Sequence, residues 1–248
     1  MKYLIVAAIV FLVALAIGCD ESHELREVTT KAIKATTEAQ SYCLSAVGTY
    51  NFDGETGEST YESEFVAPDC SHWKTSRDGD WSEGITIGDK SYIRSSDIPQ
   101  WCESPCQYED PLTGATIMTE TTSIPLEKVL EPLNWLVELE KLPDEEIEGV
   151  NCWHYRGSVD MDSYVDMLQK TAKSEDGQIP EQLEEMRHWK RNFELWVEKD
   201  SYLIRQLKEE MRFMMVNPDT GDEELFTSST NMRFYDFNKP ISIEPPRI

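Results

Sequence analysis

The side chains of this chain best suited to metal binding, nucleophilic catalysis or disulfide formation are its six cysteines and four histidines. A Cys-x-His motif occurs twice, as Cys70-Ser71-His72 and as Cys152-Trp153-His154. Residues two apart on a strand share a face, so each motif can present a thiol and an imidazole together. If the motifs met in the fold they would form a tetrahedral zinc site, but their spacing matches no standard zinc module. We therefore expect no metal site.

Sequence motifs of common enzymes are also missing. The chain has no Gly-x-Ser-x-Gly elbow, Walker loop, His-Glu-x-x-His or glycine-rich dinucleotide fingerprint. Asp160 and Asp162 stand where a helix begins, and aspartates at that position are more often caps than metal ligands. Paired carboxylates are abundant in so acidic a chain, so their presence does not indicate glycosidase chemistry. The sequence predicts a protein that is not an enzyme and needs no cofactor.

The cysteine content is typical of an oxidising compartment. Residues 41–51 and 58–67 read as strands joined by a turn, and reflection about that turn places Cys43 opposite positions near Cys70. A disulfide needs Cα atoms roughly 5.5 to 6 Å apart, which a cross-strand pair provides. Cys102 and Cys106 are close enough in sequence to bridge locally, which leaves Cys152 free. We expect the bridges Cys43–Cys70 and Cys102–Cys106.

The first residues of the chain have the composition of a secretory signal. Lys2 is followed by an apolar run from Leu4 to Ile17, which is short for a membrane span of roughly 20 residues. Cys19 after Ala16-Ile17-Gly18 resembles a bacterial lipobox, although the leucine lies four residues before the cysteine, at Leu15. We expect residues 1–18 to be a lipoprotein signal peptide and Cys19 to be acylated. A cleaved soluble protein and an uncleaved anchor helix are the alternatives.

The net charge limits the partners. Acidic residues number 47 against 23 basic ones, which gives a formal net charge of −24. Such a surface repels nucleic acid and anionic headgroups. Membrane attachment would then come from N-terminal acyl chains of the palmitate type, of which two or more give stable anchoring. The chain is predicted to lie outside the cytoplasm, on the outer face of the cytoplasmic membrane.

The order of elements predicts one domain after the signal. Residues 19–40 contain the lipidated cysteine and an amphipathic helix, and residues 41–248 form a β-rich domain. Closely spaced turns predict an antiparallel meander after residue 41. A helix kinked at Pro132 is expected over residues 125–139, and a helical insertion at about 160–191. Long hairpin strands follow to residue 237.

The predicted elements follow one another as a helix, a meander, further helices and closing strands. This order, together with the sequence segments 65–69, 83–94 and 234–241, resembles the lipoprotein-carrier family of LolA, LolB, LppX and LprG. The resemblance implies an α+β fold in which helices cover the open side of a strongly curved antiparallel sheet, an incomplete β-barrel. It implies that the hollow between them binds a lipid or an acylated molecule, for shielding or transfer. The alternative is a tethered envelope sensor or interaction module on the same fold, with a protein partner and no exchangeable lipid.

Large apolar side chains of the predicted sheet and helices are the candidates for the wall of that hollow. Ordinary core packing is an equally valid explanation for each of them. The candidates are Trp81, Ile85, Ile87, Tyr92, Leu130, Leu133, Leu195, Val197, Ile204 and Phe234.

Overall fold

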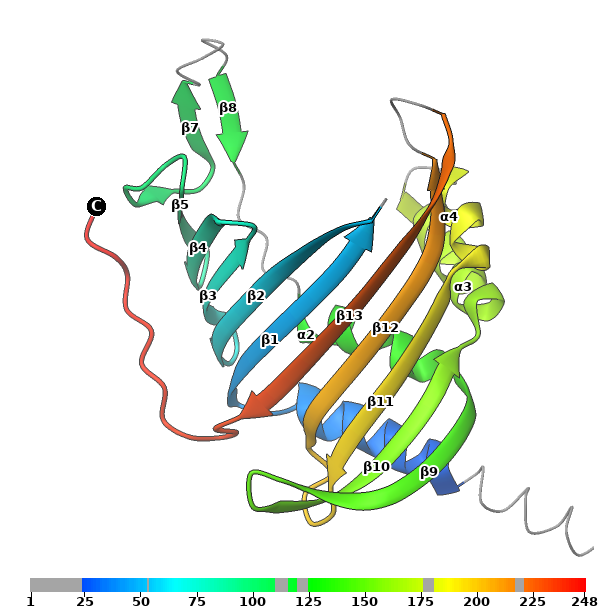
Figure 1. Ribbon diagram of the computed structural model, residues 1–248. Coiled ribbons are helices and arrows are strands. Elements are labelled where there is room, and N and C mark those ends of the chain that lie inside the picture. Colours follow the sequence, from blue (N-terminus) through cyan, green and yellow to red (C-terminus); the bar gives the residue numbers. More distant parts are fainter. Residues whose placement is uncertain (1–23, 53, 110–115, 120–124, 176–180, 217–220) are drawn as a thin grey trace, which may run out of the picture.

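One open antiparallel sheet of 11 strands dominates the computed structural model, which describes residues 24–52, 54–109, 116–119, 125–175, 181–216 and 221–248 (Figure 1). The strand order is β6-β5-β4-β3-β2-β1-β13-β12-β11-β10-β9, and β7 and β8 form a separate hairpin. The strands are β1 (Ser41–Phe52), β2 (Glu55–Val66), β3 (Cys70–Arg77), β4 (Asp80–Ile87), β5 (Lys90–Ser95), β6 (Cys102–Glu103), β7 (Cys106–Glu109), β8 (Thr116–Thr119), β9 (Leu136–Ile147), β10 (Val150–Val159), β11 (Lys190–Glu198), β12 (Ile204–Val216) and β13 (Glu223–Tyr235).

Helices cover one face of the sheet, and the hydrophobic core lies between them and the strands (Figure 1). Besides an N-terminal helix at residues 24–37, they are α2 (Leu126–Leu130), the 3₁₀ helix η1 (Glu131–Trp135), α3 (Met161–Glu175), α4 (Glu181–Glu185) and the 3₁₀ helix η2 (Met186–His188). The predicted α+β class, a curved open antiparallel sheet with helices on one side, is confirmed. Within the described part of the chain, no helix is both long and apolar enough to span a membrane.

The alternation of side chains along each strand gives the sheet two different faces. On β1, Tyr42 and Leu44 are buried in the core under the helices, whereas Val47 is 48% exposed on the other side. Because register partners on adjacent strands point to the same side, this assignment extends across the sheet. We call the side that carries Tyr42 the helix-covered face and the side that carries Val47 the open face.

A buried hydrogen bond ties the N-terminal helix to the sheet. Thr36 is fully buried, and its Oγ1 accepts the backbone N–H of Ile204 at the start of β12, at 2.9 Å. Leu25, Val28 and Ala32 bury the same helix in the core. This helix is therefore held by a polar contact as well as by its apolar face.

The substitution Thr36→Val should lower the free energy of unfolding by about 1–3 kcal/mol, because it keeps the shape and leaves the buried N–H of Ile204 without an acceptor. Thr30→Val is the matched control, since the Thr30 hydroxyl is exposed and bonds the Arg26 carbonyl within the helix. We expect the control to change stability by less than about 0.5 kcal/mol. Urea denaturation of both variants gives the comparison, and equal stabilities would contradict the role of Thr36.

The helix expected over residues 125–139 is shorter than predicted. It ends at Trp135, and Leu136 begins β9 with an extended backbone. Pro132 lies in the first turn of η1, where its missing N–H and fixed φ favour a break in the helix. Leu133 and Leu136 are both buried, so they contribute to the core without belonging to one helix.

The expected helical insertion contains α3, α4 and η2, which lie beside one end of β11 and β12 (Figure 1). Asp160 caps α3, since its carboxylate accepts the backbone N–H of Ser163 at 3.1 Å and the Ser163 hydroxyl at 2.7 Å. Arg187 joins the helices through ion pairs with Asp162 and Asp166 of α3 and with Glu184 of α4.

The predicted disulfide between Cys43 and Cys70 is wrong, because both residues are free thiols. Cys43 faces Glu64 of β2, and β2 separates it from Cys70, the first residue of β3. Two strand spacings of about 4.8 Å exceed the roughly 7 Å that a disulfide can bridge. Cys102 is assigned to a disulfide. The side chain of Cys106 lies outside the described ones, so the Cys102–Cys106 bridge stays a prediction.

Candidate functional site

An apolar cavity of about 300 Å³ lies between the helix-covered face and α2. Its volume is at the lower end of the range of about 300–1,000 Å³ that small-molecule sites occupy. Residues from four neighbouring strands and one helix form its wall. They are Tyr42, Leu44, Ala46, Tyr61, Ser63, Trp73, Leu126, Val129, Thr230 and Met232.

The strand register explains the cavity. Ala46 on β1 is flanked by Tyr61 of β2 and by Met232 of β13, so a methyl group stands between two long side chains. In the next pair along the sheet, Ser63 faces Trp73 of β3. Small residues at these central positions leave space that the larger neighbours do not fill. The cavity therefore follows from the side chains on one face of four adjacent strands, β3, β2, β1 and β13.

Trp73 lies flat on the neighbouring strand because Gly84 makes room for it. A Cβ atom at Gly84 would stand 2.5 Å from the indole ring of Trp73, closer than packed atoms allow. The Nε1–H group of Trp73 is buried and has no hydrogen-bond partner among the described residues. A buried donor without an acceptor is costly, so the wall of the cavity contains an unsatisfied donor.

The wall is uncharged, in a protein whose net charge is −24. Burial raises the pKa of the Tyr42 and Tyr61 hydroxyls, so both remain neutral donors at physiological pH. Tyr42 stacks on Phe65 with ring centroids 5.1 Å apart, which fixes one side of the wall. An apolar ligand with a few hydrogen-bonding atoms fits this environment, and an ionic ligand does not.

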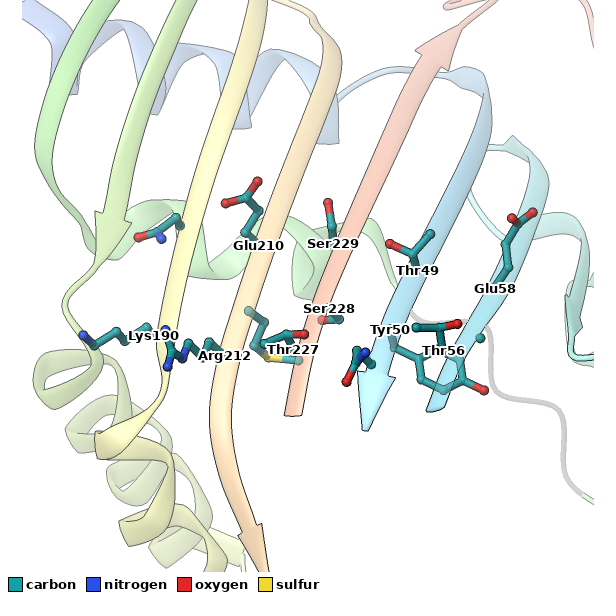
Figure 2. Close-up of a pocket in the computed structure, with 14 residues that line it drawn as sticks. Thr49, Tyr50, Thr56, Glu58, Lys190, Glu210, Arg212, Thr227, Ser228 and Ser229 are labelled. Atoms are coloured by element: carbon teal, nitrogen blue, oxygen red, sulfur yellow. The ribbon is translucent and has the colours of Figure 1, made fainter. Parts of the chain in front are cut away.

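Larger hollows lie on the open face, but charged side chains line them. One of about 810 Å³ crosses β2, β1, β13, β12 and β11 and contains Lys190, Glu210 and Arg212 (Figure 2). A second, of about 650 Å³, contains Glu140, Arg156 and other charged side chains. Burial of hydrocarbon is unfavourable against such walls. The smaller apolar cavity is therefore the candidate site for an apolar ligand.

The ten residues predicted for the wall lie elsewhere. Six of them belong to the packed core on the helix-covered side, and each is at most 2% exposed. They are Leu130, Leu133, Leu195, Val197, Ile204 and Phe234. The other four lie on the open face, because they share a face of β4 with Glu83 or pair with a residue that does. They are Trp81, Ile85, Ile87 and Tyr92. None of the ten lines the apolar cavity. The residues that do were missed, although the alternation along β1 and β2 contained their signal.

The two Cys-x-His motifs do not meet. They lie on β3 and β10, which five strands separate, so the zinc arrangement that would need them together is excluded. Each histidine instead lies between two glutamates of the neighbouring strands. His154 Nε2 is 3.0 Å from Glu194 and its Nδ1 is 3.4 Å from Glu145. His72 has the same arrangement with Glu64 and Glu83. The motifs thus form cross-strand polar contacts on the open face.

Glu83 is the central acceptor of the first cluster. His72 Nε2 lies 2.8 Å from its Oε1, and Arg94 Nε donates to its Oε2 at 2.7 Å. Burial by itself would raise the pKa of Glu83, but the hydrogen bonds from His72 and Arg94 and the charge of Arg94 outweigh it. The pKa of the carboxyl therefore lies below its ordinary value of 4.5.

The sign of this shift gives a pH-dependent prediction. A carboxyl whose pKa is lowered by folding contributes stability above its unfolded pKa, and that contribution is lost as the pH falls through the folded value. Glu83→Gln should lower the free energy of unfolding by about 1–3 kcal/mol at pH 7, and the difference from wild type should shrink below about pH 4.5. Denaturant titrations at several pH values test this, with the exposed Glu62→Gln on β2 as control. A pH-independent difference would contradict it.

Comparisons with known proteins find solved structures with a similar fold, but no match to a family model or to a curated protein. No protein-family model matches the chain. No curated protein matches it either. Among solved structures, the lipoprotein LppX of Mycobacterium tuberculosis is 14% identical, with 89% of this chain and 98% of LppX covered and a TM-score of 0.50. LprF of Mycobacterium bovis is 11% identical over 90% and 97%, with a TM-score of 0.48. The likeness to LppX confirms the predicted fold.

Proposed function

We propose that this protein binds a lipid or a single acyl chain in the apolar cavity under α2, to shield it from water or to transfer it. The observation that carries the proposal is the uncharged wall of ten residues in a strongly acidic protein. Each buried methylene contributes about 0.8 kcal/mol, so a chain of a few carbons gains enough to bind. The fold shared with the lipoprotein LppX supports this function.

Attachment to the membrane is the second part of the proposal. Cys19 and the preceding segment lie outside the described residues, and their lipobox-like sequence is the support for an acyl anchor. The described chain begins at residue 24 with the N-terminal helix, five residues after Cys19. The domain would then work close to the outer face of the cytoplasmic membrane, where lipid cargo is available.

Native mass spectrometry tests the binding function directly. The secreted chain with Cys19→Ser, which has no thiol to acylate at that position, would be purified from an oxidising periplasm and incubated with membrane lipid extract. We expect a reproducible adduct that organic extraction identifies as a glycerolipid or fatty acid. Protein that stays bare after incubation would contradict the proposal and favour the envelope sensor with a protein partner.

The indole of Trp73 gives a site-specific prediction for the same complex. Its buried Nε1–H lacks a partner among the described residues, so a carbonyl oxygen of the bound lipid should accept a hydrogen bond from it. Addition of methyl octanoate, a neutral ester with a short acyl chain, should move one indole resonance downfield in a spectrum of ¹⁵N-tryptophan-labelled protein. The variant Trp73→Phe assigns that resonance by its loss. If methyl octanoate binds and the Trp73 resonance stays in place, this group does not contact the ligand.

A further inference from the structure

The hollow of about 810 Å³ on the open face is a groove lined by polar and charged side chains, and it is separate from the proposed lipid cavity. Two rows of side chains form its floor, each running across β11, β12, β13, β1 and β2 (Figure 2). The first row is Lys190, Arg212, Thr227, Asn51 and Thr56. The second row is Asn192, Glu210, Ser229, Thr49 and Glu58. Four strand spacings of about 4.8 Å make each row roughly 19 Å long.

Two positive charges stand directly opposite each other at one end of the groove. Lys190 and Arg212 are register partners on β11 and β12, and like charges in that position are destabilising. Other cations on this face have carboxylate partners, such as Lys208 with Glu210 at 2.6 Å and Arg94 with Glu83 at 2.5 Å. Among the described residues, neither Lys190 nor Arg212 lies within ion-pair distance of a carboxylate. An anion placed between them would remove the repulsion.

The rest of the first row offers hydrogen-bonding groups that the protein does not use itself. The side chains of Thr227, Asn51 and Thr56 form no hydrogen bond with another described residue. Other hydroxyls of the sheet bond each other across strands, as Thr60 does with Ser76 at 2.8 Å. Three available polar side chains in line with a cation pair suit an extended ligand that carries hydroxyl groups and a negative charge.

We propose that this groove binds an acidic oligosaccharide. A carboxylate or phosphate of the sugar bridges Lys190 and Arg212, and sugar hydroxyls exchange hydrogen bonds with Thr227, Asn51 and Thr56. The roughly 19 Å of the row has room for about three sugar rings. Glu210 and Glu58 in the second row repel additional negative charge, which favours a ligand with its charge concentrated at one end. This site lies on the opposite face from the lipid cavity and does not depend on it.

Isothermal titration with 3′-sialyllactose, a trisaccharide whose single carboxylate lies on its terminal sugar, is the test on the full secreted chain. We expect saturable binding that weakens as sodium chloride is raised, and a loss of at least about tenfold in affinity for Lys190→Gln and for Arg212→Gln. Lys74→Gln removes the same charge from the open face on β3 and should bind as the wild type does. Thermal melting shows whether the variants fold, and relief of the repulsion should leave their melting temperatures unchanged or higher.

Other probes separate this ligand from related ones. Maltotriose, which is neutral, should bind at least about tenfold more weakly, and inorganic phosphate should compete only at higher concentration. No binding of 3′-sialyllactose, or binding that Lys190→Gln and Arg212→Gln leave unchanged, would overturn the proposal. The proposal would also be overturned if the protein bound no 3′-sialyllactose but cosedimented with vesicles of phosphatidylcholine and phosphatidylglycerol (4:1) in a way that required Lys190 and Arg212. The ligand would then be a membrane headgroup.

Discussion

The variant Ala46→Phe should lose bound lipid, with the occupied fraction in native mass spectra falling at least about tenfold relative to wild type. Ala46 is the small residue between Tyr61 and Met232 on the cavity wall, so a phenyl ring there occupies space that the ligand needs. Because the ring enters an existing cavity of about 300 Å³, the lipid-free protein should melt at the same temperature or higher.

The adjacent residue provides a matched control. Val47 is 48% exposed on the open face, so Val47→Phe adds a similar bulk on the same strand without entering the cavity. We expect this variant to retain its lipid at the wild-type level. If both variants lose the lipid equally, the effect comes from disturbance of β1, and the apolar cavity is not the binding site.

The fold could be predicted from the sequence because its strongest signals are local. Turns at short intervals and strand-like alternation predict the meander, and Leu25, Val28 and Ala32 predict the N-terminal helix that the structure contains. The strand β9 was missed. Its sequence is rich in acidic residues and contains Pro143, because it is an edge strand that is mostly in contact with solvent. Solvent-facing edges lack the apolar pattern on which such predictions depend.

The candidate site was predicted less well than the fold, because alternation separates the two faces of a strand without saying which face the helices cover. On β4, the large residues Trp81 and Ile85 attract attention, yet the small Gly84 between them faces the helices and accommodates Trp73. A cavity is formed where side chains are small. Selection by size therefore finds packed core and residues of the open face, and it overlooks small residues that line the apolar cavity, such as Ala46.

The disulfide error has a similar cause. Reflection about one turn treats two segments as a hairpin, but the chain turns again after Val66, so that Cys70 begins the next strand. Each turn moves a residue one strand further across the sheet. Sequence distance from a single turn therefore does not decide which cysteines are neighbours when several hairpins follow one another.

Truncation of a core residue should cost more stability than truncation of a cavity residue on the same strand. Phe234 is 2% exposed and packs among aromatic rings, with the Tyr42 centroid at 6.3 Å. Phe234→Ala should lower the free energy of unfolding by about 3–5 kcal/mol, since it opens a new void in packed core. Met232, two residues earlier on the same face, already borders empty space, so Met232→Ala should cost less than about 2 kcal/mol.

Lipid binding should reverse that order. Met232→Ala changes the wall itself and should alter which chain lengths bind, whereas Phe234→Leu, which retains most of the core packing, should bind the wild-type lipid. Urea denaturation and native mass spectrometry of these variants give the two rankings. The contradicting result is loss of the lipid by Phe234→Leu together with unchanged binding by Met232→Ala. The lipid would then contact Phe234, one of the residues predicted from the sequence, and the apolar cavity would not be its site.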